Sequence, residues 1–415
     1  MNVNDFRITD NKNEFVSYSG VRINYSTEEI SGSVQIIPCG LLEENNIRPV
    51  KPDLVKRQDV TGFFPVENSI IPFDLFSSIF WLLSRHEEYT CTTRDLHDRF
   101  PVAESVLFKE NLLQRPIVEE QIRWFEKVLS NHFSHYTIAE KKPVLLLTVD
   151  IDHAWAFKNK SPWVKTASWL KTLVSFNLTD LKNKIRVARG KEKDPYDTYD
   201  DLMFLLNGKT VSKMMFFLLA NRSKFDRNIS YNHPEMVRLI QRMSENFSIG
   251  IHPGYASHLN QEAFNTESQR LSLISGEKNT RSRFHYLRFK LPQSYRIAQN
   301  AGIREEHSMG HAADTGFRAG TCFPFYFYDL EEEKQGELLV YPMHIMDGTL
   351  NEYLRLTPEQ AKLRSRQLWD EVVKYGGFLS VLWHNETIND SSKWKGWKDV
   401  LEFQLNLPSN SACKK

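Results

Sequence analysis

The stretch PVLLLTVDIDHAW, residues 143–155, joins an almost continuous apolar run directly to two carboxylates. The run is typical of a buried strand, and Asp150 and Asp152 stand one residue apart at its end. Because alternate residues of an extended chain point the same way, both carboxylates are expected on one side. Two such close carboxylates repel each other unless a cation lies beside them. The stretch therefore favours a divalent metal site in which one Asp binds the ion and the other acts as a base, with a pair of exposed turn acids as the alternative.

Apolar runs and helical stretches alternate after this strand. Further strands are expected at 211–220, 247–253, 336–348 and 376–386, and helices at 197–206, 233–246, 259–275, 292–300 and 358–375. Repeated strand–helix units with near-continuous apolar strands predict a parallel sheet covered by helices, open or closed into a barrel. We assign this unit to residues 141–415.

Residues 1–140 are expected to form a smaller α/β domain of unassigned role. SGSVQIIPCG (31–40) has the pattern of a buried strand, and 73–89 and 119–133 have that of amphipathic helices, the first with Asp74 placed as its N-cap. His86, Glu87 and Glu88 fall within the first of these helices. We interpret them as a solvated helix face rather than as ligands.

Ionisable side chains gather where the predicted strands of the larger unit end. His252 ends the strand of 247–251, Arg318 lies in TGFRAGTCF, and His384 follows the strand of 378–383, with Asn385 and Glu386 behind it. Loops at the carboxyl ends of parallel strands converge, so these groups are expected at one rim together with the two aspartates.

Composition limits the classes of function. The 415 residues are 41% hydrophobic and 25% charged with a net charge of +1, which gives no general electrostatic case for binding nucleic acid. Four scattered cysteines offer neither a structural zinc site nor a disulfide framework. The polar, acidic start of the chain and the lack of any apolar run of about 18 residues predict a cytoplasmic protein without a membrane span.

The segment 156–193 has ten Lys or Arg against two acidic residues, with apolar residues at helical spacing. We interpret it as a surface helix packed on the protein through its apolar face. Peripheral contact with an anionic membrane surface is the alternative.

Four of these stretches resemble motifs of the polysaccharide deacetylase family, which are metal-dependent carbohydrate esterases on a distorted (β/α) barrel. They are LTVDID, IGIHPGYASH, GFRAGTCFPF and LSVLWHNE, in the family's order. The resemblance implies that Asp150 is the general base, that Asp152 and His252 bind the metal, that Arg318 orients the base and that His384 is the general acid. FDLFSSIFWLLSRHEEY and DLHDRF are similar to an uncharacterised α/β domain that precedes a deacetylase domain in some bacterial proteins.

The third metal ligand departs from the family pattern. The family's second motif offers two histidines at i and i+4, whereas here the residue four after His252 is Ala256. We favour His285, from RFHYLRF, as the third ligand, with His258 as the competitor and a degenerate metal site as a further alternative. His153 is expected to point to the opposite side, Asp314 to be a turn acid, and the pair His307 and His311 to lie in a loop bracketed by glycines.

The expected function is hydrolysis of N-acetyl groups on an amino-sugar-containing glycan or glycan precursor, with Zn²⁺ as the expected ion because Asp and His are its common ligands. The same site would also suit a small amide or cyclic ureide. A glycan-binding protein without catalytic activity is the alternative from another class, and a scaffold held at a membrane surface by 156–193 is a third. The sequence does not determine the sugar, the pathway or the oligomeric state.

Overall fold

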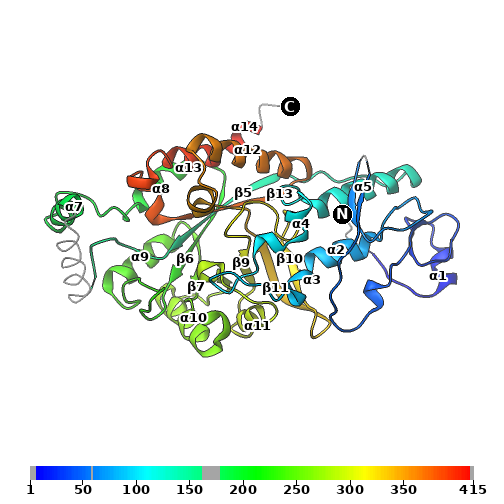
Figure 1. The fold of residues 1–415 in the computed structure, drawn as a ribbon, viewed down its shortest axis with the longest axis horizontal. Coiled ribbons are helices and arrows are strands. Elements are labelled where there is room, and N and C mark those ends of the chain that lie inside the picture. The colour runs from blue at the N-terminus through cyan, green and yellow to red at the C-terminus, as the bar shows by residue number, and fades with distance from the viewer. Residues whose placement is uncertain (1–5, 58, 161–177, 412–415) are drawn as a thin grey trace.

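The computed structural model describes residues 6–57, 59–160 and 178–411, and a nine-stranded sheet lies at its centre (Figure 1). Its strands are β5 (Pro143–Ile151), β6 (Ser212–Leu218), β7 (Ser248–His252), β8 (Arg281–Ser282), β9 (Glu305–Met309), β10 (Phe325–Asp329), β11 (Lys334–Pro342), β12 (Ile345–Met346) and β13 (Gly377–His384). The strands predicted around 211–220, 247–253, 336–348 and 376–386 are confirmed. The run 336–348 is divided between the nine-residue strand β11 and the two-residue strand β12.

The sheet order is β10–β11–β9–β8–β7–β6–β5–β13–β12, and only the β10–β11 pair is antiparallel. The sheet is therefore mixed, and it curls into a half-barrel. Strand β11 pairs with β9, yet after two residues the chain continues as β12, which pairs with β13. Between the two strands, the amide of Met343 donates a hydrogen bond to the Met309 carbonyl of β9. The amide of His344 donates one to the Ser380 carbonyl of β13. The segment 334–346 thus joins the two sides of the curl.

Strand β5 lies between β13 and β6, is apolar apart from Thr148 and Asp150, and is buried from Leu145 to its end. Its residues Leu147, Val149 and Ile151 are fully buried in one large core that also takes in Phe217 and Trp383 from the neighbouring strands. The two aspartates lie at its carboxyl end, Asp150 within the strand and Asp152 directly after it.

Helices cover the sheet on both sides. In Figure 1, α12 and α13 lie along one side and α9, α10 and α11 along the other. The helices of this region are α7 (Leu178–Ala188), α8 (Tyr199–Leu206), α9 (Pro234–Ser244), α10 (Gln261–Ser275), α11 (Gln293–Asn300), α12 (Pro358–Tyr375), α13 (Lys398–Leu405) and α14 (Leu407–Ser411). The five helices predicted between 197 and 375 are confirmed. Among the described residues, no helix is long and apolar enough to cross a bilayer.

The basic segment 156–193 is described only in part, because residues 161–177 lie outside the described residues. Helix α7 occupies its second half. The interpretation of the whole segment as one surface helix stays a prediction.

The N-terminal region holds short elements rather than a single sheet. They are α1 (Lys12–Ser17), β1 (Ile23–Tyr25), β2 (Val34–Ile36), β3 (Leu54–Lys56), β4 (Thr61–Phe63), α2 (Leu75–Leu83), α3 (His86–Thr90), α4 (Val106–Lys109) and α5 (Ile117–His132). Strands β1 and β2 form one two-stranded sheet, and β3 and β4 form another. The predicted cap is confirmed, since the Asp74 carboxylate accepts a hydrogen bond from the Ser77 amide.

The helix predicted over 73–89 is wrong in its second half. Helix α2 ends at Leu83, and Arg85 takes a left-handed conformation (φ 57°) before α3 begins. The break brings the Arg85 guanidinium, which is buried, within 2.8 Å of both Glu87 and Glu88. His86 and Glu88 are also buried, so the solvated helix face expected there is wrong.

Buried polar contacts connect the N-terminal region to the sheet region. Arg318 makes two hydrogen bonds to the Glu88 carboxylate, of 2.9 and 2.6 Å. Glu119 of α5 accepts hydrogen bonds from the Thr321 hydroxyl and the Cys322 amide. Burial raises the pKa of Glu119 to about 7, against the lowering effect of these bonds. The two parts therefore share a polar interior, and the domain boundary at 140 stays a prediction.

Candidate metal and catalytic centre

Two carboxylates and an imidazole meet at the end of β5. Asp150 is buried, and its Oδ2 lies 3.7 Å from Nε2 of His252, the last residue of β7. Asp152 Oδ1 lies 3.2 Å from the same nitrogen. Both aspartates thus face the same side, as the alternation of an extended chain predicts.

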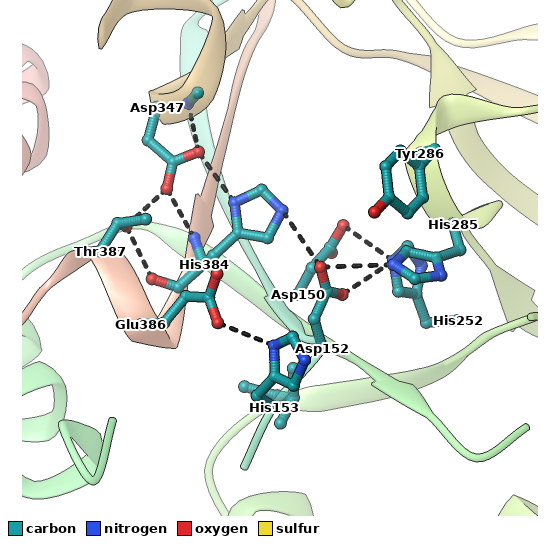
Figure 2. Close-up of polar contacts among 12 residues, drawn as sticks. Asp150, Asp152, His153, His252, His285, Tyr286, Asp347, His384, Glu386 and Thr387 are labelled. Atoms are coloured by element: carbon teal, nitrogen blue, oxygen red, sulfur yellow. Dashed lines mark hydrogen bonds and ion pairs between the residues drawn. The ribbon is translucent and has the colours of Figure 1, made fainter. Parts of the chain in front are cut away.

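His285 is the third member of the group. It lies in a 3-10 turn (His285–Leu287) that follows the short strand β8, and its Nε2 is 3.4 Å from Asp152 Oδ2. One ligand atom from each of Asp152, His252 and His285 can be chosen so that all three lie within 4.8 Å of one another. Figure 2 shows the two imidazoles side by side, facing the aspartates.

Each of these imidazoles is held through its other nitrogen. His252 Nδ1 donates to the backbone carbonyl of Arg283, and His285 Nδ1 lies 2.9 Å from the carboxylate of Asp226. Because a carbonyl or carboxylate oxygen only accepts, Nδ1 carries the hydrogen in both rings. In the neutral form that can bind a metal, each ring carries its lone pair on Nε2, the nitrogen that faces Asp152. Metal-binding histidines in proteins are commonly oriented in this way.

The donor set fits a divalent ion such as Zn²⁺. Two ligands of a tetrahedral zinc site are about 3.4 Å apart when the bonds are about 2.1 Å long. The separations from Asp152 to His252 and His285 are 3.2 and 3.4 Å. Asp152 Oδ1 is buried yet accepts no hydrogen bond within the described part of the chain. A buried carboxylate oxygen without a donor is costly, and a bound cation would remove that cost.

The charges of the group depend on one another. Burial raises the pKa of Asp152, but the nearby His285 and His252 outweigh it and hold that pKa well below its usual range. Burial lowers the pKa of His285, but Asp152 and Asp226 outweigh this effect and raise it to about 9. Negative charge therefore dominates around the imidazoles, which is the environment that a cation site requires.

The arginine beside Asp150 is Arg283, which is a correction to the role expected of Arg318. The Arg283 guanidinium is fully buried and donates to Asp150 Oδ1 at 3.2 Å and to the Thr148 hydroxyl at 2.6 Å. Arg318 instead donates to Glu88 and to the Gly310 carbonyl. Burial lowers the pKa of Arg283, partly offset by Asp150.

His384 lies on the opposite side of Asp152 from the other two imidazoles (Figure 2). It ends β13, in register with Asp150 on β5, and its Nε2 is 3.9 Å from Asp152 Oδ2. Its Nδ1 lies 2.9 Å from Asp347, a fully buried carboxylate that also accepts a bond from Thr387. Burial lowers the pKa of His384, but Asp347 first and then Asp152 and Asp150 outweigh this and raise it well above its ordinary value. These carboxylates therefore favour the protonated form of the ring.

Sequence reasoning missed Asp347 and Asp226. Asp347 follows strand β12 in the run 336–348, so attention to strand ends would have found it. Asp226 lies in a loop eight residues beyond the end of β6, and nothing in the local pattern marks it.

The structure places the remaining candidates outside this group. His258 is buried in a different turn, and its ring nitrogens accept or donate no hydrogen bond among the described residues. His153 points away from the imidazole pair and pairs with Glu386 at 2.9 Å (Figure 2). Asp314 lies 3.5 Å from Arg364.

The expected loop around His307 is wrong. His307 lies in strand β9, where it stacks on Tyr341 with 4.7 Å between ring centroids. Strand β9 is short and polar in sequence, EEHSM, and so lacks the apolar run by which the other strands are recognised.

Comparisons with known proteins give distant similarities. A model described as a family of unknown function (DUF7033) matches residues 1–134. No curated protein matches the chain. A solved structure of a candidate polysaccharide deacetylase from Mycobacterium smegmatis is 14% identical, with a TM-score of 0.40 over 64% of this chain and 87% of that one. A CE4 family pseudoenzyme from Bacillus anthracis is 10% identical, with a TM-score of 0.33 over 66% of this chain and 63% of that one. These similarities are too distant to indicate the reaction, which must be inferred from the site.

Proposed function

We propose that the protein is a metal-dependent hydrolase that removes N-acetyl groups from an amino-sugar-containing glycan or glycan precursor. The supporting observation is the group of Asp152, His252 and His285, whose donor atoms converge. A second carboxylate, Asp150, and the imidazole of His384 lie beside this group. The four sequence motifs that resemble polysaccharide deacetylases supply the choice of substrate class. In this proposal the curled sheet is the distorted barrel of that family, and residues 1–140 are a separate smaller domain.

Asp152, His252 and His285 would hold the ion. A divalent ion such as Zn²⁺ would lower the pKa of a bound water molecule and would polarise a carbonyl oxygen. The buried oxygens that orient the two histidines, from Arg283 and Asp226, fix the direction of the ligands.

Asp150 is the proposed general base. It lies beside the ligand group without being needed as a ligand, and Arg283 holds its Oδ1 through an ion pair of 3.2 Å. The carboxylate takes a proton from the attacking water as the oxygen bonds to the acetyl carbon.

His384 is the proposed general acid. Asp347 holds Nδ1, so the Nε2 proton faces the space beside Asp152. As the carbon–nitrogen bond of the amide breaks, this proton passes to the departing amine, which leaves acetate and a free amino sugar. Base and acid thus end neighbouring strands in register with each other, and both lie beside the ligand group.

Two neighbouring asparagine variants test this division of roles. Asp150→Asn should lower acetate release from an N-acetylated sugar oligomer by about 10²–10⁴-fold, because the general base is lost, while zinc content stays near wild type. Asp152→Asn should lose both zinc and activity. Metal content is measured by elemental analysis of protein purified without chelator, and folding by circular dichroism.

Asp314→Asn is the matched control, since this aspartate is partly buried and paired with an arginine elsewhere. It should keep both zinc and activity. Wild-type protein that binds no zinc and releases no acetate would refute the proposal, and equal zinc content in the Asp150 and Asp152 variants would refute the assigned roles.

A further inference from the structure

We propose that residues 95–99 of the N-terminal region complete the substrate site, by adding His97 to an aromatic platform that binds a second sugar ring beside the one that reacts. The inference rests on the proposed function for the identity of the substrate. The inference gives a role in substrate binding to the N-terminal region, to which no catalytic residue has been assigned.

The platform consists of four rings, His97, Phe225, Tyr255 and Tyr286. The Tyr286 ring lies 4.7 Å from that of His97 and 5.5 Å from that of Tyr255, between centroids. Phe225 and Tyr255 are stacked at 3.9 Å. The rings come from three loops of the sheet region and from the N-terminal region, so they meet only in the folded chain.

The platform adjoins the ligand group. Tyr286 directly follows His285, and their ring centroids are 4.5 Å apart. Figure 2 shows the Tyr286 hydroxyl on the side that faces Asp150 and Asp152. Tyr286 is 37% exposed, whereas His285 is 4% exposed, so the surface passes from the buried ligands to an open aromatic face within one residue.

Polar contacts hold the rings in place. His97 Nδ1 lies within hydrogen-bonding distance of the Tyr255 hydroxyl, at 3.1 Å. The Arg288 guanidinium donates to the carbonyls of both residues at 2.9 Å and lies 4.2 Å from the centroid of the Tyr255 ring. A binding surface held in this way loses little conformational entropy when a ligand binds.

Arg99 ties the N-terminal region to the strained part of the site. Tyr286 and Leu287 both have left-handed backbones, with φ of 61° and 51°, which side chains with a Cβ rarely adopt. The Arg99 guanidinium, buried and paired with Asp95 at 2.7 Å, donates to the Tyr286 carbonyl at 2.9 Å. Strain of this kind persists where the surroundings enforce it, and it is concentrated at ligand sites.

The chemistry of the platform suits a sugar. Aromatic rings bind the C–H faces of sugar rings, and the mix of phenol, imidazole and arginine edges offers partners for hydroxyl groups. Burial first, and Arg99 second, lower the pKa of His97. Its neutral ring therefore presents an uncharged face to the ligand at neutral pH.

The test compares a short and a long substrate. N-acetylglucosamine reaches only the ligand group, whereas its β-1,4-linked tetramer also extends over the platform. His97→Ala should raise the KM for the tetramer about fivefold, the size of one lost stacking contact, with kcat and the monomer's kinetics unchanged. His97→Phe keeps a ring and should retain most of the affinity. Both variants keep the backbone carbonyl that Arg288 binds.

Binding is measured separately from turnover by titrating the tetramer into Asp150→Asn protein with and without His97→Ala. Tyr326→Ala, which removes an exposed tyrosine from edge strand β10, is the control and should change neither measurement. Tetramer binding unaffected by His97→Ala, or equal losses for monomer and tetramer, would overturn the platform. If wild-type protein binds the tetramer through His97 but releases no acetate, the platform stands and the proposed hydrolase function fails.

Discussion

At the scale of single residues, two buried arginines illustrate how position decides function. Arg283 and Arg318 are both almost fully buried, and each is paired with a carboxylate. Arg283 pairs with Asp150, which adjoins the ligand group, whereas Arg318 pairs with Glu88 of the N-terminal region. In the proposed mechanism the first pair affects proton transfer, whereas the second is expected to affect stability.

The two arginines can be separated by matched substitutions. Arg283→Gln should lower kcat/KM by about 100-fold, because Asp150, the proposed general base, loses the ion pair that positions it. Arg318→Gln should lower the free energy of unfolding by about 3–5 kcal/mol, because Glu88 loses one of its two buried partners, while kcat/KM of the folded protein stays within about threefold. Urea unfolding and steady-state kinetics measure the two effects. A larger kinetic loss for Arg318→Gln would reverse the assignment.

The two arginines also show how far the sequence predicts which residues form the site. Arg318 lies in GFRAG, which resembles a motif of the deacetylase family, and that resemblance predicts that Arg318 orients Asp150. Arg283 follows a two-residue strand that has no apolar run, so neither its burial nor its direction is visible in sequence. Asp150, Asp152, His252 and His384 end longer apolar strands, where alternation determines the direction of a side chain.

At the scale of elements, helix α3 and the loop of Arg318 form one ionic unit. Glu88 lies between Arg85 and Arg318, and burial raises its carboxyl pKa while the two cations lower it further, to about 2. Its usual value is 4.5. A carboxylate whose folded pKa is depressed stabilises the protein above its unfolded pKa and loses that effect as the pH falls.

Glu88→Gln should therefore be less stable than wild type at pH 7, and the difference should shrink as the pH falls from 4.5 toward 2. The pH-dependent part is about 3 kcal/mol at most, since one pKa unit corresponds to about 1.4 kcal/mol. Urea unfolding of both proteins at pH 7 and pH 3.5 measures it. A stability difference that does not change with pH would show that Glu88 is not the group that titrates.

Elements also show why sequence patterns succeed or fail. The long apolar strands and the capped helices were predictable because periodicity and capping are local. The split of 73–89 into α2 and α3 was not, because it depends on the pairing of Glu88 with Arg318, 230 residues away. Short polar strands such as β8 and β9 owe their conformation to their neighbours in the sheet.

At the scale of the whole molecule, the N-terminal region and the sheet region depend on each other. The amide of Val118 donates to the Gly320 carbonyl, and the amide of Phe317 donates to the Leu113 carbonyl. These bonds lie beside the buried pairs of Glu88 and Glu119. Removing either part would expose the surface between them to water and would remove these buried contacts.

A chain of residues 141–415 should consequently fail to fold cooperatively, since the stability of a whole protein is only about 5–15 kcal/mol. The full chain should unfold in a single transition. A chain lacking residues 1–17 is the control, because helix α1 buries no side chain, and it should unfold as the full chain does. Thermal unfolding followed by circular dichroism and size-exclusion chromatography checks all three. Cooperative unfolding of residues 141–415 at the full chain's midpoint would contradict the expectation.

The hydrogen bond from Arg99 to the Tyr286 carbonyl has a consequence for any exchange of one region of the chain. One end lies in the segment matched by a family of unknown function, and the other lies one residue from a metal-ligand candidate. A recombination that exchanged either half for an unrelated partner would separate donor from acceptor. The left-handed turn at Tyr286 and Leu287 would then lose this contact with the earlier half.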